Sequence, residues 1–237
     1  QEVLDFLFFD VNILNFYVKF AYSQPKFKFF CLKIEKLIKD EVKLKKILLA
    51  KDVDGLNALS NSTKGDSFIV EQLEIFQFFF FKIYCKHLDH EEFIYEEDSQ
   101  GNNILHSLII RQSVPLNNFF LTQIKSKLSD EKFKEFLRSK NNAQQNLLHL
   151  IIQKSSCDFL ETKKMEKLFF IRKLILKNLE PDEVKEMLME KDENYFLPLH
   201  LFMENPNLIY FRKSILSIYL KFCSVDETIK VDEHKPL

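Results

Sequence analysis

A short phrase recurs along this chain, and the recurrence limits the possible fold more than any other feature of the sequence. Three copies end in Leu-His, two weaker copies precede them, and a truncated copy closes the chain. The final positions of the five complete copies are 45, 46, 43 and 51 residues apart. Self-similarity at a period of about 20–50 residues is typical of proteins built from stacked repeats. In chain order the copies are DVNILN (10–15), GLNALS (55–60), GNNILH (101–106), QQNLLH (144–149), YFLPLH (195–200) and EHKPL (233–237).

The stretches between the copies have the pattern of helices, one long and one short. The long ones carry apolar residues at the spacing of a helix face. The short ones open with paired acids, which suit the positive end of a helix dipole. Ser129 is expected as an N-cap and Pro181 as a first-turn residue. The long helices are predicted at Lys26–Lys39, Ile69–Leu88, Lys164–Leu179 and Leu208–Phe222, and the acidic pairs are Asp40-Glu41, Glu91-Glu92, Asp130-Glu131, Asp182-Glu183 and Asp226-Glu227.

These patterns predict an all-α fold in which helical units stack into a solenoid, because one unit alone cannot bury its apolar face. Residues 1–237 are interpreted as a single solenoid segment of about five repeats. Glu2–Leu7 resembles Glu183–Leu188 inside a later unit, and the chain ends just before the next His would come. We therefore expect a segment cut from a longer array. The approximate repeat bounds are 10–54, 55–100, 101–143, 144–194 and 195–232.

The residues around the phrase follow a known pattern, which is clearest in Asp52–Leu59, Asp98–His106 and Pro198-Leu199-His200. This pattern resembles the D-x-x-G-x-T-P-L-H phrase of ankyrin repeats, with Asn57, Asn103 and Asn146 at the Thr position. The resemblance implies a binding scaffold whose turns and first helices form the partner surface. The units are longer than the usual ankyrin length of about 33 residues. Elongated or extra helices are therefore expected, and HEAT-like or armadillo-like stacking is the structural alternative.

Composition excludes several classes of protein. Three glycines are too few for a dinucleotide-binding or P-loop enzyme. The 34 Lys and Arg are balanced by 35 Asp and Glu, whereas a nucleic-acid binder usually has a clear basic excess. Four cysteines without C-x-x-C spacing indicate a reducing compartment. Charged residues interrupt the most apolar stretches, 3–22 and 69–88, so no membrane span is expected. The predicted location is intracellular and cytoplasmic, in a host cell if the protein is a secreted effector.

Three histidines of the phrase, His106, His149 and His200, suggest a metal site. Packed helices lie about 8–10 Å apart, whereas a zinc ligand must reach the metal at about 2.0–2.1 Å. All three could bind one ion only with strain. The preferred interpretation, which the ankyrin resemblance also implies, is that each imidazole hydrogen-bonds the turn backbone. No metal site and no cofactor is predicted.

Two further clusters were weighed as chemical sites. The segment 87–91 places two histidines three residues apart beside two acids, but a solvated helix junction explains it better than metal binding. Cys157 follows His149 by eight residues, which would allow a Cys–His nucleophile pair, but no surrounding motif supports it. G-x-S-x-G and H-E-x-x-H are also absent from the sequence, so no enzyme is predicted.

Aromatic residues are concentrated in two places. Lys26–Phe30 alternates lysine with phenylalanine, as in grooves that bind single-stranded nucleic acid. The preferred interpretation is that these lysines extend around buried phenylalanines on an amphipathic helix. Phe78–Phe81, with Phe76 nearby, is expected to be buried on two sides, since four consecutive helical residues point in all directions.

The resemblance implies a non-enzymatic protein–protein interaction scaffold of ankyrin type. The alternative is a structural or targeting module of a larger multidomain effector or toxin whose activity lies outside this segment. Tyr195 and Phe196 are of most interest because they replace small turn residues, although packing beneath a longer loop explains them equally well. The identity of the partner protein and the oligomeric state are left open. The candidate binding residues are Asp54, Leu56, Gln100, Asn102, Gln145, Tyr195 and Phe196.

Overall fold

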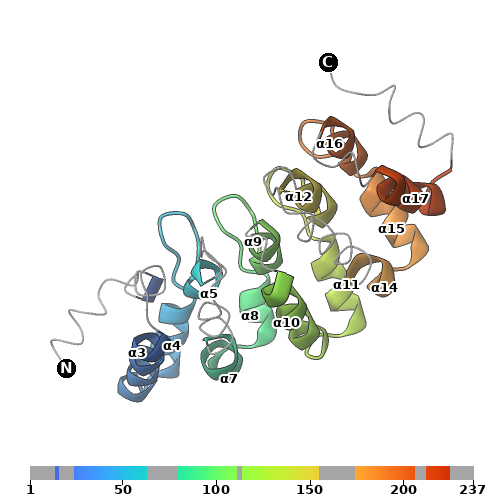
Figure 1. Ribbon diagram of the computed structural model, residues 1–237. Coiled ribbons are helices and arrows are strands. Elements are labelled where there is room, and N and C mark those ends of the chain that lie inside the picture. Colours follow the sequence, from blue (N-terminus) through green and yellow to red (C-terminus); the bar gives the residue numbers. More distant parts are fainter. Residues whose placement is uncertain are drawn as a thin grey trace. The chain divides into compact units, whose positions relative to one another are not determined.

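The computed structural model describes residues 14–15, 24–62, 79–110, 114–154, 174–205 and 212–224. Every regular element within these ranges is a helix (Figure 1), so the predicted all-α class is confirmed for the described part of the chain. The chain divides into two compact units, Gln1–Lys127 and Leu128–Leu237. Each unit is treated below by itself.

The first unit has a core of aromatic side chains. Phe80, Tyr84, Phe93 and Phe120 are each at most 1% exposed. Phe80 meets Phe93 and Phe120 edge to face, with ring centroids 5.7 and 5.3 Å apart. Such arrangements stabilise beyond the area they bury. The helices of this unit are α3 (Gln24–Leu37), α4 (Glu41–Leu48), α5 (Ala58–Asn61), the π-helical turn η1 (Phe79–Tyr84), α7 (Cys85–His87), α8 (His90–Ile94), α9 (Ile104–Ile110) and α10 (Val114–Lys125).

The second unit is held by contacts between short helices. The helix carrying the phrase at 144–149 packs against the helix carrying the phrase at 195–200, and α15 packs against both α16 and α17. Phe136, Met187 and Phe202 are buried in this unit. Its helices are α11 (Asp130–Arg138), α12 (Leu147–Lys154), α14 (Leu176–Asn178), α15 (Pro181–Met189), α16 (Pro198–Glu204) and α17 (Arg212–Phe222).

The short acidic helices begin where the sequence predicts. Ser129 is the N-cap of α11, and its hydroxyl accepts a hydrogen bond from the Lys132 amide at 3.3 Å. Pro181 is the first residue of α15. Glu183 reaches back to the Glu180 amide at 2.8 Å, as the third residue of a capping box does. The predicted helix start at 226–227 lies outside the described residues.

The predicted long helices are described in part. Lys26–Lys39 corresponds to α3, whereas Ile69–Leu88, Lys164–Leu179 and Leu208–Phe222 are described only from residues 79, 174 and 212 onward. Two-sided burial of the phenylalanine run holds for Phe80 but not for Phe81, which is 38% exposed.

One interpretation of the sequence is wrong. The lysines of 26–30 were expected to surround buried phenylalanines, and this fails for Phe29, which is 63% exposed. The side chains of Phe27 and Phe30 lie outside the described ones. The face of α3 that packs inward carries Cys31 and Ile34, which are 2% and 4% exposed. Phe29 precedes Cys31 by two residues, which is about 200° around a helix, so its ring points outward.

Candidate interaction surface

Four turns with the same hydrogen-bond pattern precede the copies of the phrase. They span residues 52–56, 98–102, 141–145 and 192–196. In each, the first residue's amide donates to the fifth residue's carbonyl, and the fourth residue's amide donates to the first residue's carbonyl, at 2.9–3.1 Å. The side chain of the first residue closes the turn by accepting from the fifth residue's amide at 2.8–3.0 Å. That first residue is Asp52, Asp98, Asn141 or Asp192.

The fourth residue of every turn has a left-handed backbone. Gly55 and Gly101 occupy this position in the first unit, with φ of 77° and 73°. Gln144 and Tyr195 occupy it in the second unit, with φ of 56° and 64°. A residue with a Cβ pays roughly 1–2 kcal/mol for this conformation. Tyr195 is also 67% exposed, so the burial of its ring stabilises the turn too little to offset the strain of the left-handed backbone in full.

Successive turns within a unit are joined by backbone hydrogen bonds. In the first unit, the Ser99 amide and hydroxyl donate to the Asp54 carbonyl at 3.1 and 2.8 Å. In the second unit, the Glu193 amide donates to the Ala143 carbonyl at 2.9 Å. The second residue of one turn thus binds the third residue of the turn before it. The approach is close, since a Cβ on Gly55 would lie 2.4 Å from the Ser99 nitrogen.

The three phrase histidines bond the backbone, as the sequence analysis expected. Nδ1 of His106 accepts from the Asn103 amide at 3.1 Å, Nδ1 of His149 from the Asn146 amide at 3.3 Å, and Nδ1 of His200 from the Leu197 amide at 3.1 Å. Each imidazole therefore caps the start of its own helix. Among the described residues, no group of three or more His, Cys, Asp or Glu could hold a metal ion.

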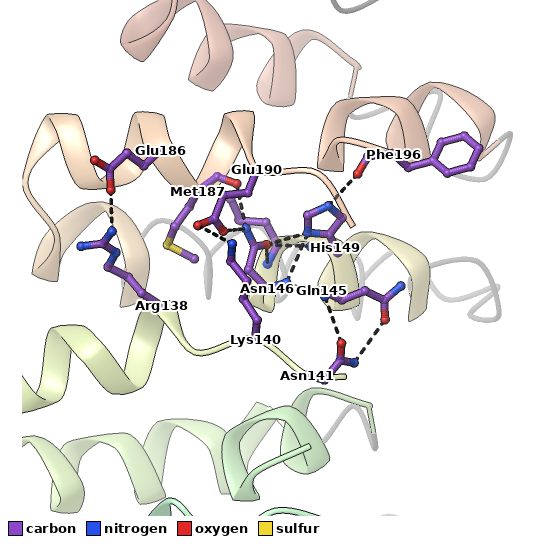
Figure 2. Close-up of polar contacts among 11 residues, drawn as sticks. Arg138, Lys140, Asn141, Gln145, Asn146, His149, Glu186, Met187, Glu190 and Phe196 are labelled. Atoms are coloured by element: carbon purple, nitrogen blue, oxygen red, sulfur yellow. Dashed lines mark hydrogen bonds and ion pairs between the residues drawn. The ribbon is translucent and has the colours of Figure 1, made fainter. Parts of the chain in front are cut away.

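His149 also links the two turns of the second unit. Its Nε2 donates to the Phe196 carbonyl at 3.0 Å (Figure 2). Burial lowers the pKa of His149, although the Phe196 carbonyl acts in the opposite direction. The Asn146 amide group extends the link, because Nδ2 donates to the Met187 carbonyl at 2.8 Å and to Glu190 at 2.7 Å.

Two buried tyrosines support the helices behind the turns, and the sequence analysis missed them. The Tyr84 hydroxyl donates to the Leu48 carbonyl at the end of α4 and accepts from the Leu59 amide at the start of α5 at 3.2 Å. The Tyr219 hydroxyl donates to the Leu188 carbonyl at 3.2 Å. Burial raises the pKa of both phenols. The one sequence feature that the two tyrosines share, and that could have pointed to them, is an Ile-Tyr pair at 83–84 and 218–219.

Ion pairs recur in register between neighbouring short helices and turns. Lys45 and Lys134 each stand five residues after an N-cap, and they pair with Glu92 at 3.1 Å and Glu183 at 3.2 Å. Each of these glutamates is the third residue of a capping box. A backbone amide and then the lysine lower the pKa of both. The lysines that precede the first and third turns form the other two pairs, Lys51–Glu96 at 2.8 Å and Lys140–Glu190 at 2.9 Å.

The predicted binding residues fall into two groups. Asp54, Gln100 and Tyr195 stand at the third or fourth position of their turns and are exposed. The other four stand at the fifth position, where the chain turns back into a helix. Leu56 and Asn102 are buried there at 6% and 3% exposure, and Gln145 and Phe196 are half-buried. Leu56 and Asn102 therefore lie beneath the turns.

We call the second to fourth turn positions the turn tips. Most of these residues are exposed, whereas Gly55 and Ala143 are half-buried and Gly101 is buried. The sequence analysis did not single out Val53, which is 94% exposed, or Gln144 and Glu193. The tips carry no Lys or Arg and include two acids, Asp54 and Glu193. They are thus neutral to acidic and rich in amide groups. The tip residues are Val53, Asp54, Gly55, Ser99, Gln100, Gly101, Asn142, Ala143, Gln144, Glu193, Asn194 and Tyr195.

A small cavity in the first unit is lined by Cys31, Glu35 and His87 together with aliphatic side chains. Its volume of about 10 Å³ suits one water molecule and is far too small for a substrate. Burial raises the pKa of the Cys31 thiol, which opposes a nucleophilic role. Nε2 of His87 lies 3.0 Å from the Glu35 carboxylate, so this histidine is explained as a hydrogen-bond partner of Glu35. Cys157 lies outside the described residues.

No protein-family model matches this chain, and no curated protein matches its sequence. Within the part of the chain that the structure describes, no helix is long and apolar enough to cross a membrane.

Proposed function

We propose that this chain is a non-enzymatic protein–protein interaction scaffold of ankyrin type that binds another protein through its turn tips. The observation that carries the proposal is the recurrence of one turn in four places, each closed by its first side chain and followed by a capped helix. Hydrogen bonds between successive turns within each unit add to it. Stacking of repeats on their neighbours is the general basis of solenoid scaffolds.

The bonded turns favour ankyrin-type stacking over the HEAT-like or armadillo-like alternative. Packing of helix pairs alone requires no hydrogen bond between connecting turns. Here Ser99 bonds to Asp54 and Glu193 bonds to Ala143 through the backbone. His106, His149 and His200, which cap the starts of their helices, stand at the final His position of the phrase on which the ankyrin resemblance rests.

Tyr195 is the proposed anchor of the binding surface. Tyrosine is enriched among the residues that carry most of the binding energy at interfaces, and its ring combines apolar area with a polar hydroxyl. The strained backbone at Tyr195 costs stability, and glycine would relieve it. A large exposed side chain kept at such a position supports a role in recognition. Because the tips carry acids and amides, the partner is expected to present a neutral or basic polar surface.

The cysteines of the described residues are compatible with the intracellular location that we propose. Cys31, Cys85 and Cys223 are all free thiols. A reducing compartment keeps thiols in this state.

The test is affinity capture from cell lysate by the parent chain, a Tyr195→Ala variant and a Leu220→Ala control. Leu220 is 53% exposed, lies on α17 and is not one of the tip residues. A partner held by the parent and the control but lost by Tyr195→Ala would support the proposal. A partner retained equally by the parent, the Tyr195→Ala variant and the control would contradict binding through this tip. Circular dichroism must first show that the three proteins have equal helicity.

A further inference from the structure

Helix α3 presents large apolar side chains to the outside. Phe29 is 63% exposed, Leu32 52% and Leu37 46%. Residues 29 and 32 lie on the same side of a helix because they are three positions apart. Figure 1 shows α3 as a distinct helix near the N-terminal end of the first unit. Apolar side chains concentrated on one exposed face mark an interaction site more reliably than scattered ones do.

The same face is basic. Lys33 and Lys36 are exposed, and Nζ of Lys33 lies 5.4 Å from the centroid of the Phe29 ring. Helix α3 carries four lysines and a single acid, Glu35. That acid forms an ion pair with Lys86, which lowers the pKa of Glu35. Lys33 and Lys36 therefore face outward toward an anionic partner.

This combination favours one kind of partner. A second copy of the face would bring its lysines against one another, which is repulsive. A single strand of nucleic acid binds by stacking bases on successive aromatic rings. Among the described side chains of α3, Phe29 is the only exposed aromatic, and Leu32 and Leu37 cannot stack. An anionic bilayer uses both features, since its acyl boundary takes apolar side chains and its headgroups take lysines.

We propose that α3 docks on an anionic lipid surface, with Phe29 and Leu32 entering the headgroup–acyl boundary and Lys33 and Lys36 binding the headgroups. The helix has 14 residues, whereas a span needs roughly 20, so it would lie in the plane of the interface. This role is separate from the turn tips and would hold the proposed scaffold at a membrane.

The test is cosedimentation of the full chain with vesicles of phosphatidylcholine alone and of phosphatidylcholine mixed with phosphatidylserine, at about 0.1 M salt. The first variant, Phe29→Ser with Leu32→Ser, removes the apolar contacts. The second, Lys33→Gln with Lys36→Gln, removes two charges. A matched control, Lys213→Gln with Leu220→Ser, changes exposed residues of the same types on α17. All substituted side chains are exposed, so melting temperatures should stay near the parent value.

We expect the parent and the control to bind the vesicles that contain phosphatidylserine and to leave those of phosphatidylcholine alone. Each lysine near such a surface is worth about a fivefold change, so the lysine variant should bind roughly 30-fold more weakly. The vesicle affinity of the Phe29→Ser, Leu32→Ser variant should fall at least about tenfold. Absence of binding by the parent would overturn the proposal. Vesicle binding by the Phe29→Ser, Leu32→Ser variant at the parent's affinity would also overturn the proposal, because the attraction would then be purely electrostatic. Tighter binding of a fluorescent oligothymidine than of vesicles would assign the face to nucleic acid instead.

Discussion

The hydroxyl of Tyr84 joins the end of one helix to the start of another, and replacing it with hydrogen tests whether that junction stabilises the first unit. In Tyr84→Phe the ring stays in place, but two buried backbone groups lose their partner, the Leu48 carbonyl and the Leu59 amide. Neither atom can reach water easily, since Leu48 and Leu59 are each 1% exposed. An unsatisfied buried group costs about 1–3 kcal/mol. Two such groups, each at about 1–2 kcal/mol in the lower part of that range, give an expected loss of about 2–4 kcal/mol.

The measurement is thermal and urea unfolding, with hydrogen exchange to assign the loss to the first unit. For a chain of this size 1 kcal/mol corresponds to about 2–4 °C, so the melting temperature should fall by about 4–16 °C. Tyr195→Phe is the control and should change stability by less than about 0.5 kcal/mol because this side chain is 67% exposed. A loss below about 0.5 kcal/mol in Tyr84→Phe would refute the reasoning.

The same phenol also predicts a response to alkali. Burial raises the pKa of Tyr84 above its ordinary value of 10.0, so the folded unit keeps a proton that the unfolded chain releases. Stability from this group is therefore complete below pH 10 and is lost as the pH rises beyond it. The alkaline decline in melting temperature should be shallower in Tyr84→Phe than in the parent, and equal slopes would contradict this linkage.

Three further substitutions test other parts of the structure. Gln144→Gly should raise the free energy of unfolding by about 1 kcal/mol, because glycine relieves the left-handed backbone at an exposed position, and a lower urea midpoint would contradict the strain argument. Glu92→Gln should flatten the loss of melting temperature below about pH 4.5, since a backbone amide and then Lys45 lower the pKa of Glu92, and its stabilising charge is lost as the pH falls. If the melting temperature of Glu92→Gln fell as steeply at acid pH as that of the parent, this explanation would be wrong. Asn146→Ala should cost about 2–4 kcal/mol in urea unfolding, because it removes a helix cap and leaves a carbonyl of α15 without its donor, whereas a cost under about 1 kcal/mol would count against the link.

The sequence predicted the helix starts and the role of the phrase histidines because each depends on residues only a few positions apart. Ser129 and its amide partner are three residues apart, as are His106 and Asn103. Capping of this kind is a local property of the chain. The arrangement of the repeats into a longer solenoid stays a prediction.

The parts that could not be predicted depend on residues far apart in the chain or on which side chain turns inward. Tyr84 finds its carbonyl partner 36 residues away, and no local pattern identifies it. Leu56 and Asn102 belong to turns, which usually favours exposure. Both are buried because the fifth residue of the turn leads back into a helix. Tyr195 was noted as a large residue in a turn, but its left-handed backbone became visible only by comparison with Gly55 and Gly101.

The ties between neighbouring turns and short helices have mechanical consequences. The bonds from Lys45 to Glu92, from Ser99 to Asp54 and from His149 to Phe196 join residues 47, 45 and 47 positions apart. Under a stretching force, each unit should therefore release chain in increments of one bonded loop. An extended residue spans about 3.5 Å, so an increment of some 45 residues lengthens the chain by about 160 Å. The bonds that set the register of the turns would therefore be the bonds that break first under load, one loop at a time.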